Sequence, residues 1–241
     1  MKRIFLASLL IAVCSLIAFG QVQSRAEVLN DIETKRAELA NLEKQFLSPS
    51  AEDRATYAEF LSQPGTGLIR LLPREKFDSV VNKKAALTVQ GGGAYYSFVR
   101  LTHEYGYGSD IELYSGYLSV GFAGADYGML IKLEGARLED VSTGLPGVAF
   151  MAKYQAVADE PQARIEQSRF GTGTVIDGAT YKRRVPVEVG ATYVLRSIDF
   201  GNSDVLVAFQ VVRQDTDGSL IIAWRMLEKY PTPKLARNEA K

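Results

Sequence analysis

The sequence predicts an α+β protein, in which an N-terminal helical segment precedes a mainly antiparallel β-sandwich or partly open β-barrel. Three observations lead to this fold class. Apolar residues recur with a helical period before residue 63, they alternate with a period of two from about residue 85, and short turns rich in glycine separate the alternating runs. The predicted organisation is a leader at 1–20 or 1–26, a helical arm at 24–63, a connector at 64–84, a β domain at 85–230 and a polar tail at 231–241.

The first residues are typical of a secretory leader. Lys2 and Arg3 precede an uncharged stretch, residues 4–19, which is shorter than the roughly 20 residues that a membrane-spanning helix needs. Cleavage after Gly20 or after Ala26 would follow a small-x-small pattern, which signal-peptide cleavage sites need. The alternative is that the leader is retained as a membrane anchor. The sequence therefore predicts an exported protein, periplasmic or extracellular, with no membrane association after cleavage and no cysteine for disulfides.

The helical arm is predicted to hold two helices. The first has a heptad-like seam that covers fewer than three heptads and is formed by Val28, Ile32, Lys35, Leu39, Leu42 and Phe46. This helix either packs on the following domain or binds a partner, and we expect a protein partner or self-association through residues 27–62. Ser50 and Asp53 predict a capping box for the second helix, whose apolar stripe contains Tyr57, Phe60 and Leu61.

The β domain is predicted from about eight alternating runs. Two of them are hairpins, at 110–122 around Ser115–Gly116 and at 204–227 around Asp217–Gly218. The others are strands expected at 85–90, 94–105, 127–135, 148–157, 181–190 and 191–200. Loops are expected at 135–147 and 158–178, and no helix is expected between the strands.

Composition excludes several functional classes. Lysine plus arginine equals aspartate plus glutamate at 28 each, which argues against nucleic-acid binding. A single histidine excludes metal sites that need several imidazoles. Neither a Walker A loop nor a Gly-x-Ser-x-Gly elbow is present, and we predict no cofactor and no catalytic motif. Glycosidase chemistry needs only two carboxyl groups and stays open.

Two glycine-containing stretches resemble binding motifs but are interpreted as turns. Around Asp215 and Asp217, an EF-hand register would place Arg213 and Trp224 where carboxylates are required. The glycines of residues 121–128 have a spacing close to a dinucleotide-binding fingerprint, but no helical pattern follows them.

The candidate site is the tyrosine-rich segment at 95–117. Its candidate binding residues are His103, Glu104, Tyr105, Tyr107, Asp110, Glu112, Tyr114 and Tyr117. Tyrosines can stack on sugar rings, and the acidic groups with His103 could bind a divalent cation or transfer protons. In the alternative, the tyrosines are ordinary strand residues and His103 is hydrogen-bonded in the core. We expect an exported, non-catalytic binding or scaffolding protein, or alternatively a carbohydrate-binding module or glycan hydrolase.

Overall fold

The structure is a computed structural model that describes residues 24–236, apart from 86, 88, 104, 106 and 107. The predicted leader at 1–20 therefore lies outside the described residues. The chain divides into two compact units at Leu42–Glu43. The first unit contains most of helix α1 (Arg25–Phe46), none of whose residues is buried. Of the described helices, none combines the length and apolar character that crossing a bilayer requires.

Helices α2 (Ala51–Thr56) and α3 (Ala58–Leu61) replace the single second helix expected from the sequence. The Ser50–Asp53 capping box is confirmed, because the Ser50 hydroxyl accepts from the Asp53 N–H at 3.0 Å and the Asp53 carboxylate accepts from the Ser50 N–H at 3.1 Å. Phe60 is buried as its place in the predicted stripe requires.

A five-stranded antiparallel sheet forms the centre of the second unit. Its order is β1 (Thr66–Leu71), β11 (Leu220–Lys229), β10 (Ser203–Gln214), β9 (Thr192–Asp199) and β5 (Tyr127–Leu133). The predicted C-terminal hairpin is confirmed, with Phe209 opposite Trp224. The prediction of a connector at 64–84 missed β1. This strand is an edge strand whose Ile69 and Leu71 are buried.

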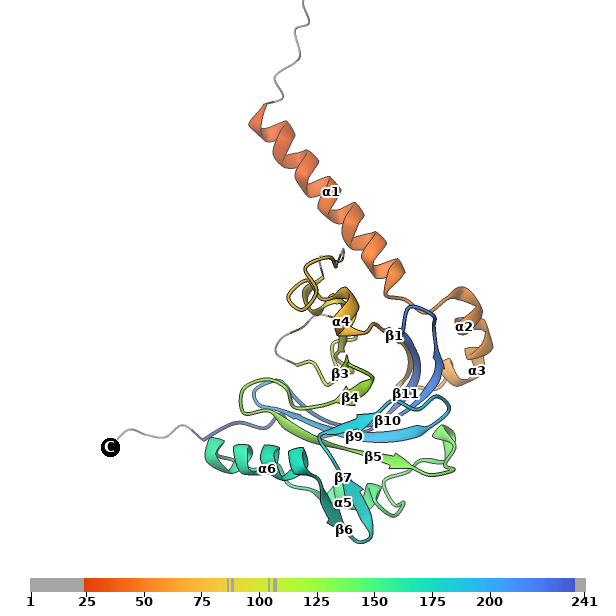
Figure 1. Cartoon of the computed structure of the whole chain (residues 1–241), viewed down its shortest axis with the longest axis vertical. Helices are drawn as coiled ribbons and strands as arrows, with labels where there is room; N and C mark the ends of the chain where they lie inside the picture. Colours follow the sequence, from red (N-terminus) through yellow and green to blue (C-terminus); the bar gives the residue numbers. More distant parts are fainter. Residues whose placement is uncertain (1–23, 86, 88, 104, 106–107, 237–241) are drawn as a thin grey trace, which may run out of the picture. The chain divides into compact units, whose positions relative to one another are not determined.

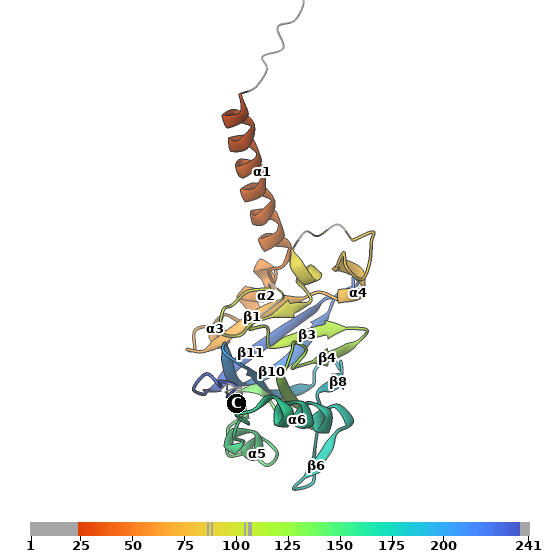
Figure 2. The same cartoon turned by 90° about the vertical axis from the view of Figure 1, so that its left-hand side faces the viewer.

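A four-stranded sheet packs face to face with the first, in the order β2 (Tyr95–Tyr96), β3 (Ile111–Tyr114), β4 (Tyr117–Ser119) and β8 (Arg184–Pro186). One core cluster draws buried residues from all strands of both sheets. The edges also meet: the Leu72 N–H donates to the Gly93 carbonyl at 3.0 Å, and Leu130 and Lys182 form a β-bridge. The α+β prediction is confirmed, with a sandwich whose edges are partly closed. Figure 2 shows β3, β4 and β8 side by side.

The other face of the five-stranded sheet buries a second core against helices (Figure 1). The strand expected at 148–157 is wrong, because helix α5 (Val148–Lys153) buries Val148 and Met151 at helical spacing. The loop expected at 158–178 contains α6 (Glu160–Thr172), capped by the Asp159 carboxylate, and a small hairpin of β6 (Thr174–Ile176) and β7 (Ala179–Tyr181). Helices do lie between the strands, contrary to expectation.

The long strand expected at 94–105 is also wrong. Strand β2 ends at Tyr96 because the chain reverses in a tight turn, in which the Leu101 N–H donates to the Ser97 carbonyl at 2.8 Å. The described part of 85–90 holds no strand and leads into a 3-10 turn, η1 (Gln90–Gly93). Gly92 has a φ of 61°, and a Cβ there would lie 2.2 Å from the backbone of Phe77, at the end of helix α4 (Arg74–Phe77).

Candidate functional site

The outer face of the four-stranded sheet gathers half of the candidate residues. Side chains alternate along β3 and β4, so Ile111, Leu113 and Leu118 enter the core between the sheets. The intervening Glu112, Tyr114 and Tyr117 lie on the opposite face. Tyr105, which follows the tight turn, joins them because its ring lies 4.5 Å from that of Tyr95 on β2. The sequence did not predict that these residues share a face.

Arg74 covers the middle of this face. Its guanidinium lies 5.6 Å from the Tyr95 ring and 5.5 Å from the Tyr114 ring, and it bonds the Glu112 carboxylate at 3.0 Å. Glu112 also accepts from the Tyr95 hydroxyl at 2.6 Å and from the Ser119 hydroxyl at 2.9 Å. Burial and the bond to Glu112 raise the pKa of Tyr95. The Glu112 carboxylate is therefore fully engaged in a structural network of hydrogen bonds. The exposed tyrosines of this face, Tyr105 and Tyr117, lie at its two ends.

A cleft of about 760 Å³ opens at the Tyr105 end. Its lining comes from six separate stretches of chain and consists of Gln90, Arg100, Tyr105, Phe122, Ala123, Gly124, Ala125, Asp126, Phe200 and Leu235. Tyr105 is 37% exposed, while Phe122 and Phe200 are half-buried. The cleft thus offers aromatic surface that the fold holds partly open to solvent.

The turn after β4 shapes one wall of the cleft. Gly121 has a φ of 64°, and a Cβ there would lie 2.5 Å from the Tyr127 Cα atom. Only glycine fits this close approach of two backbones. The turn directs Phe122 onto the Tyr95 ring at a centroid distance of 5.1 Å.

Two polar side chains accompany the aromatic rings. The Asp126 carboxylate accepts from the Phe200 N–H at 2.9 Å, and burial, reinforced by the charge of Asp199, raises its pKa to about 7. Near neutral pH this carboxyl group can therefore either donate or accept a hydrogen bond. Arg100 is exposed, and one N–H of its guanidinium donates to the side-chain oxygen of Asn202 at 3.0 Å. Its other N–H groups can donate to a ligand.

His103 and Asp110 lie apart from this cleft. His103 Nε2 lies 2.8 Å from the Arg70 carbonyl oxygen, its ring meets Tyr96 edge-on, and burial lowers its pKa. Asp110 is fully buried, accepts from the Phe98 N–H at 2.8 Å, and has a pKa that burial raises to about 7. These contacts agree with a structural role in the core. Glu104 and Tyr107 lie outside the described residues.

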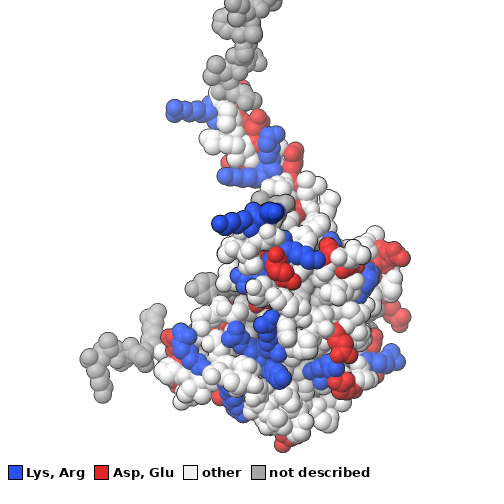
Figure 3. Space-filling model, viewed as in Figure 1, with Lys and Arg blue, Asp and Glu red and all other residues white. Residues whose placement is uncertain are grey.

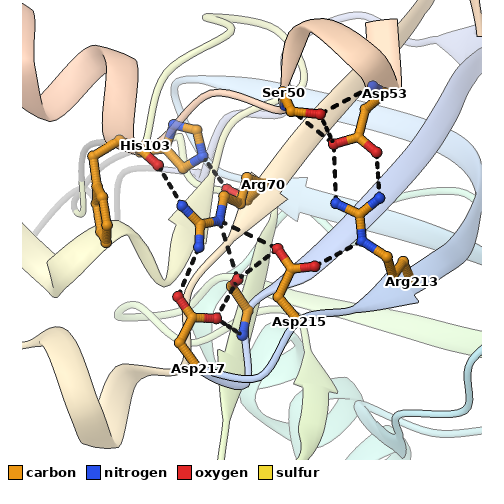
Figure 4. Close-up of polar contacts among 9 residues, drawn as sticks. Ser50, Asp53, Arg70, His103, Arg213, Asp215 and Asp217 are labelled. Carbon is orange, nitrogen blue, oxygen red and sulfur yellow. Dashed lines mark hydrogen bonds and ion pairs between the residues drawn. The ribbon is translucent and has the colours of Figure 1, made fainter. Parts of the chain in front are cut away.

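Next to His103, a chain of ion pairs joins α2, β1 and the turn between β10 and β11 (Figure 4). Arg213 pairs with both carboxylate oxygens of Asp53 and with Asp215 at 2.7 Å, and Arg70 pairs with Asp217 at 2.7 Å. Asp215 and Asp217 thus pair with arginines at a tight turn, in which the Gly218 N–H donates to the Asp215 carbonyl at 2.9 Å, and the turn interpretation is confirmed. In the part of the chain that the structure describes, no three His, Cys, Asp or Glu residues are grouped to hold a metal ion.

Sequence reasoning missed Arg100, Phe122, Asp126 and Phe200. The alternating pattern predicts a strand at Phe122, and the glycine spacing predicts a turn at Asp126. Nothing in local spacing signals that these residues meet, since the cleft forms only when β2, β4, β5 and β9 assemble. Comparison with known proteins found no matching family model, no matching curated protein and no matching solved structure.

Proposed function

We propose that the chain is a non-catalytic binding protein of the cell envelope that holds a glycan residue in the Tyr105 cleft. The observation that carries this proposal is the lining of the cleft, where three aromatic rings accompany one carboxyl group and one guanidinium group. The envelope location follows from the predicted leader at 1–20.

This lining is complementary to a sugar ring. A pyranose presents an apolar face of C–H groups, which packs on aromatic rings, and a rim of hydroxyl groups, which need hydrogen-bond partners. Tyr105, Phe122 and Phe200 supply the apolar contact, while Asp126 and Arg100 supply an acceptor and donors. Hydrolysis would need a second carboxyl group roughly 5 to 9.5 Å away. Of the described residues that line the cleft, only Asp126 is acidic.

A glycan array probed with the parent, Tyr105→Ala and Tyr105→Phe tests the proposal. The alanine variant should bind any glycan that the parent selects roughly two- to twelvefold more weakly, because it loses one stacking contact of about 0.5–1.5 kcal/mol. The phenylalanine variant keeps the ring and should retain most of the affinity. A parent that binds no glycan, or an alanine variant that binds as well as the parent, refutes this function.

The same glycans separate binding from catalysis. Incubation with the parent should release no reducing ends, and Asp126→Asn should weaken binding. Release of reducing ends that is abolished by Asp126→Asn or Glu104→Gln would instead establish the glycan hydrolase.

Self-association through α1 is a second candidate function, favoured by the exposure of its seam. Val28, Ile32, Leu39 and Phe46 are each 38–43% exposed and Leu42 is 62% exposed, although a heptad seam normally faces another helix. Most of the stability of a helix in a protein comes from packing of its apolar face, and no residue of α1 is buried, so a second copy of α1 would supply that packing.

Light scattering on the full chain tests this second candidate. The parent should have the mass of a dimer, and Ile32→Lys with Leu39→Lys should reduce it to that of a monomer. Ala37→Lys with Ala40→Lys adds the same charge outside the seam and should leave the dimer intact. A monomeric parent would rule out self-association at the concentration used.

A further inference from the structure

We infer that the glycan is acidic, and that its anionic groups bind a basic strip formed by Lys182, Arg183 and Arg184 where the chain enters β8. This inference rests on the proposed glycan function and narrows its ligand to a class, the anionic polysaccharides. The strip lies at the edge of the four-stranded sheet whose outer face leads to the cleft.

The cations of the basic strip have no carboxylate partners among the described residues. Among the other described residues, some basic side chains form ion pairs within 4.0 Å, namely those of Arg70, Arg74, Lys132, Arg137, Arg164, Arg169, Arg196 and Arg213. Other basic side chains, such as Lys83, Lys84 and Lys229, form none, but only Lys182, Arg183 and Arg184 are three in succession along the described chain. Three consecutive cations without such pairs form a local positive field, even though the whole chain is neutral. Figure 3 shows blue side chains gathered near the middle of the visible face, with no red side chain among them.

The backbone holds the basic strip rigidly. Lys182 exchanges both backbone hydrogen bonds with Leu130, at 2.7 and 3.1 Å. The Arg183 N–H donates to the Phe170 carbonyl at 2.6 Å, and its carbonyl accepts from the Val120 N–H at 3.1 Å. Because the backbone that carries these cations is already ordered, binding of a polyanion would not include the entropic cost of ordering it.

Arg184 is positioned by an aromatic ring. Its guanidinium lies 4.0 Å from the Tyr117 ring centroid, and one of its nitrogens donates to the Tyr114 carbonyl at 3.3 Å. Tyr117 is 40% exposed, so ring and guanidinium together face solvent. Stacking leaves the other guanidinium donors available, and they match a carboxylate or sulfate in geometry.

The segment that follows β4 links the basic strip to the cleft. Val120 bonds Arg183, and Phe122, two residues further on, lines the cleft. Two residues of chain span at most about 7 Å, and the turn at Gly121 shortens this distance, so the backbone of the basic strip lies within roughly the length of one sugar unit of the cleft lining. A polysaccharide can therefore reach both places, whereas a flat membrane surface cannot enter a cleft. The favoured occupant is accordingly an acidic polysaccharide, with an anionic membrane as the alternative that the test must separate.

The test compares binding of polygalacturonate, which carries a carboxylate on every sugar, with binding of its neutral methyl ester. At about 20 mM salt, where charges act over tens of ångströms, the parent should prefer the acid form. Lys182→Gln with Arg183→Gln and Arg184→Gln should weaken binding of the acid at least about tenfold and leave the ester unchanged. Lys83→Gln with Lys84→Gln and Lys229→Gln removes three exposed cations elsewhere and should leave both affinities as in the parent.

The outcomes distinguish this inference from the function on which it rests. Equal affinity of the parent and the basic-strip variant for polygalacturonate overturns the inference. In that case, loss of ester binding in Tyr105→Ala would still support glycan binding in the cleft. Conversely, a cleft variant that binds both polymers like the parent refutes the glycan function alone. Binding to phosphatidylglycerol vesicles that depends on the basic strip, without binding to polygalacturonate, would replace the polysaccharide by a membrane and overturn the inference.

Discussion

Removal of the Asp204 side chain should be among the most destabilising single changes in this protein. Asp204 on β10 binds Arg196 on β9 through two hydrogen bonds of 2.5 and 2.9 Å, and the two side chains are 3% and 2% exposed. Arg196 also donates to the Met151 carbonyl of α5 at 2.6 Å, and its guanidinium lies 3.4 Å from the Tyr230 ring centroid. The pair therefore joins the sheet to a helix and to the C-terminal segment.

The magnitude follows from leaving a buried cation without its counter-charge. Breaking such a pair typically costs about 3–5 kcal/mol, against a total stability of about 5–15 kcal/mol. In a unit of this size, Asp204→Ala should lower the Tm by roughly 6–20 °C. The pKa of Asp204 is raised, because burial outweighs the favourable effect of Arg196. The desolvation cost of the pair is therefore large, and replacing both partners by Arg196→Met with Asp204→Leu should recover most of the loss.

Urea unfolding followed by fluorescence of Trp224, the only tryptophan, measures these changes. The matched control is Glu160→Ala, which breaks the exposed pair with Arg164 on α6 and should cost less than about 0.5 kcal/mol. A loss below about 1 kcal/mol for Asp204→Ala would refute the reasoning, as would a double variant no more stable than the single one.

Three further predictions concern pH and local geometry. Since the pKa of Asp110 is about 7 in the folded chain and lower when unfolded, its stabilisation is complete below about pH 4 and lost as pH rises through 7. Thermal denaturation of Asp110→Asn should therefore show a flatter decline between pH 5 and 8, and an unchanged slope would contradict this. Arg213 holds the pKa of Asp53 at about 2, so the stabilisation by Asp53 is present above about pH 4 and lost as pH falls through 2. At neutral pH, Asp53→Ala should cost about 1–3 kcal/mol in urea unfolding through loss of the cap and of an ion pair screened by solvent, whereas a cost near zero would show that the cap is dispensable. Gly121→Ala, whose Cβ would lie 2.5 Å from the Tyr127 Cα atom, should destabilise the chain by more than about 2 kcal/mol and weaken glycan binding. Gly124→Ala, with a φ of 51° and nothing within 4 Å of the new Cβ, should cost only about 1 kcal/mol, and equal effects of the two substitutions would contradict the steric argument.

Local sequence determined those parts of the fold whose pattern is repeated over many residues. The hairpin of β10 and β11 was predictable because apolar residues alternate along both strands and Asp217–Gly218 supplies the turn. The capping box of α2 was predictable because Ser50 and Asp53 bond each other within one helical turn. In each case the residues that determine the structure are close in sequence.

Tertiary contacts decided the elements that lack such a pattern. Only Ala163 and Phe170 of α6 are buried, so its helical period is faint, and Val148 to Lys153 form a helix because Val148 and Met151 pack on the five-stranded sheet. The cleft depends on tertiary structure entirely. Tyr105 could be nominated as an aromatic in a tyrosine-rich segment, but Phe122, Asp126 and Phe200 meet it only because separate strands end at the same place. The pattern of a chain records which side of each strand is buried, whereas a binding site depends on which strand ends become neighbours, and that is set by long-range packing.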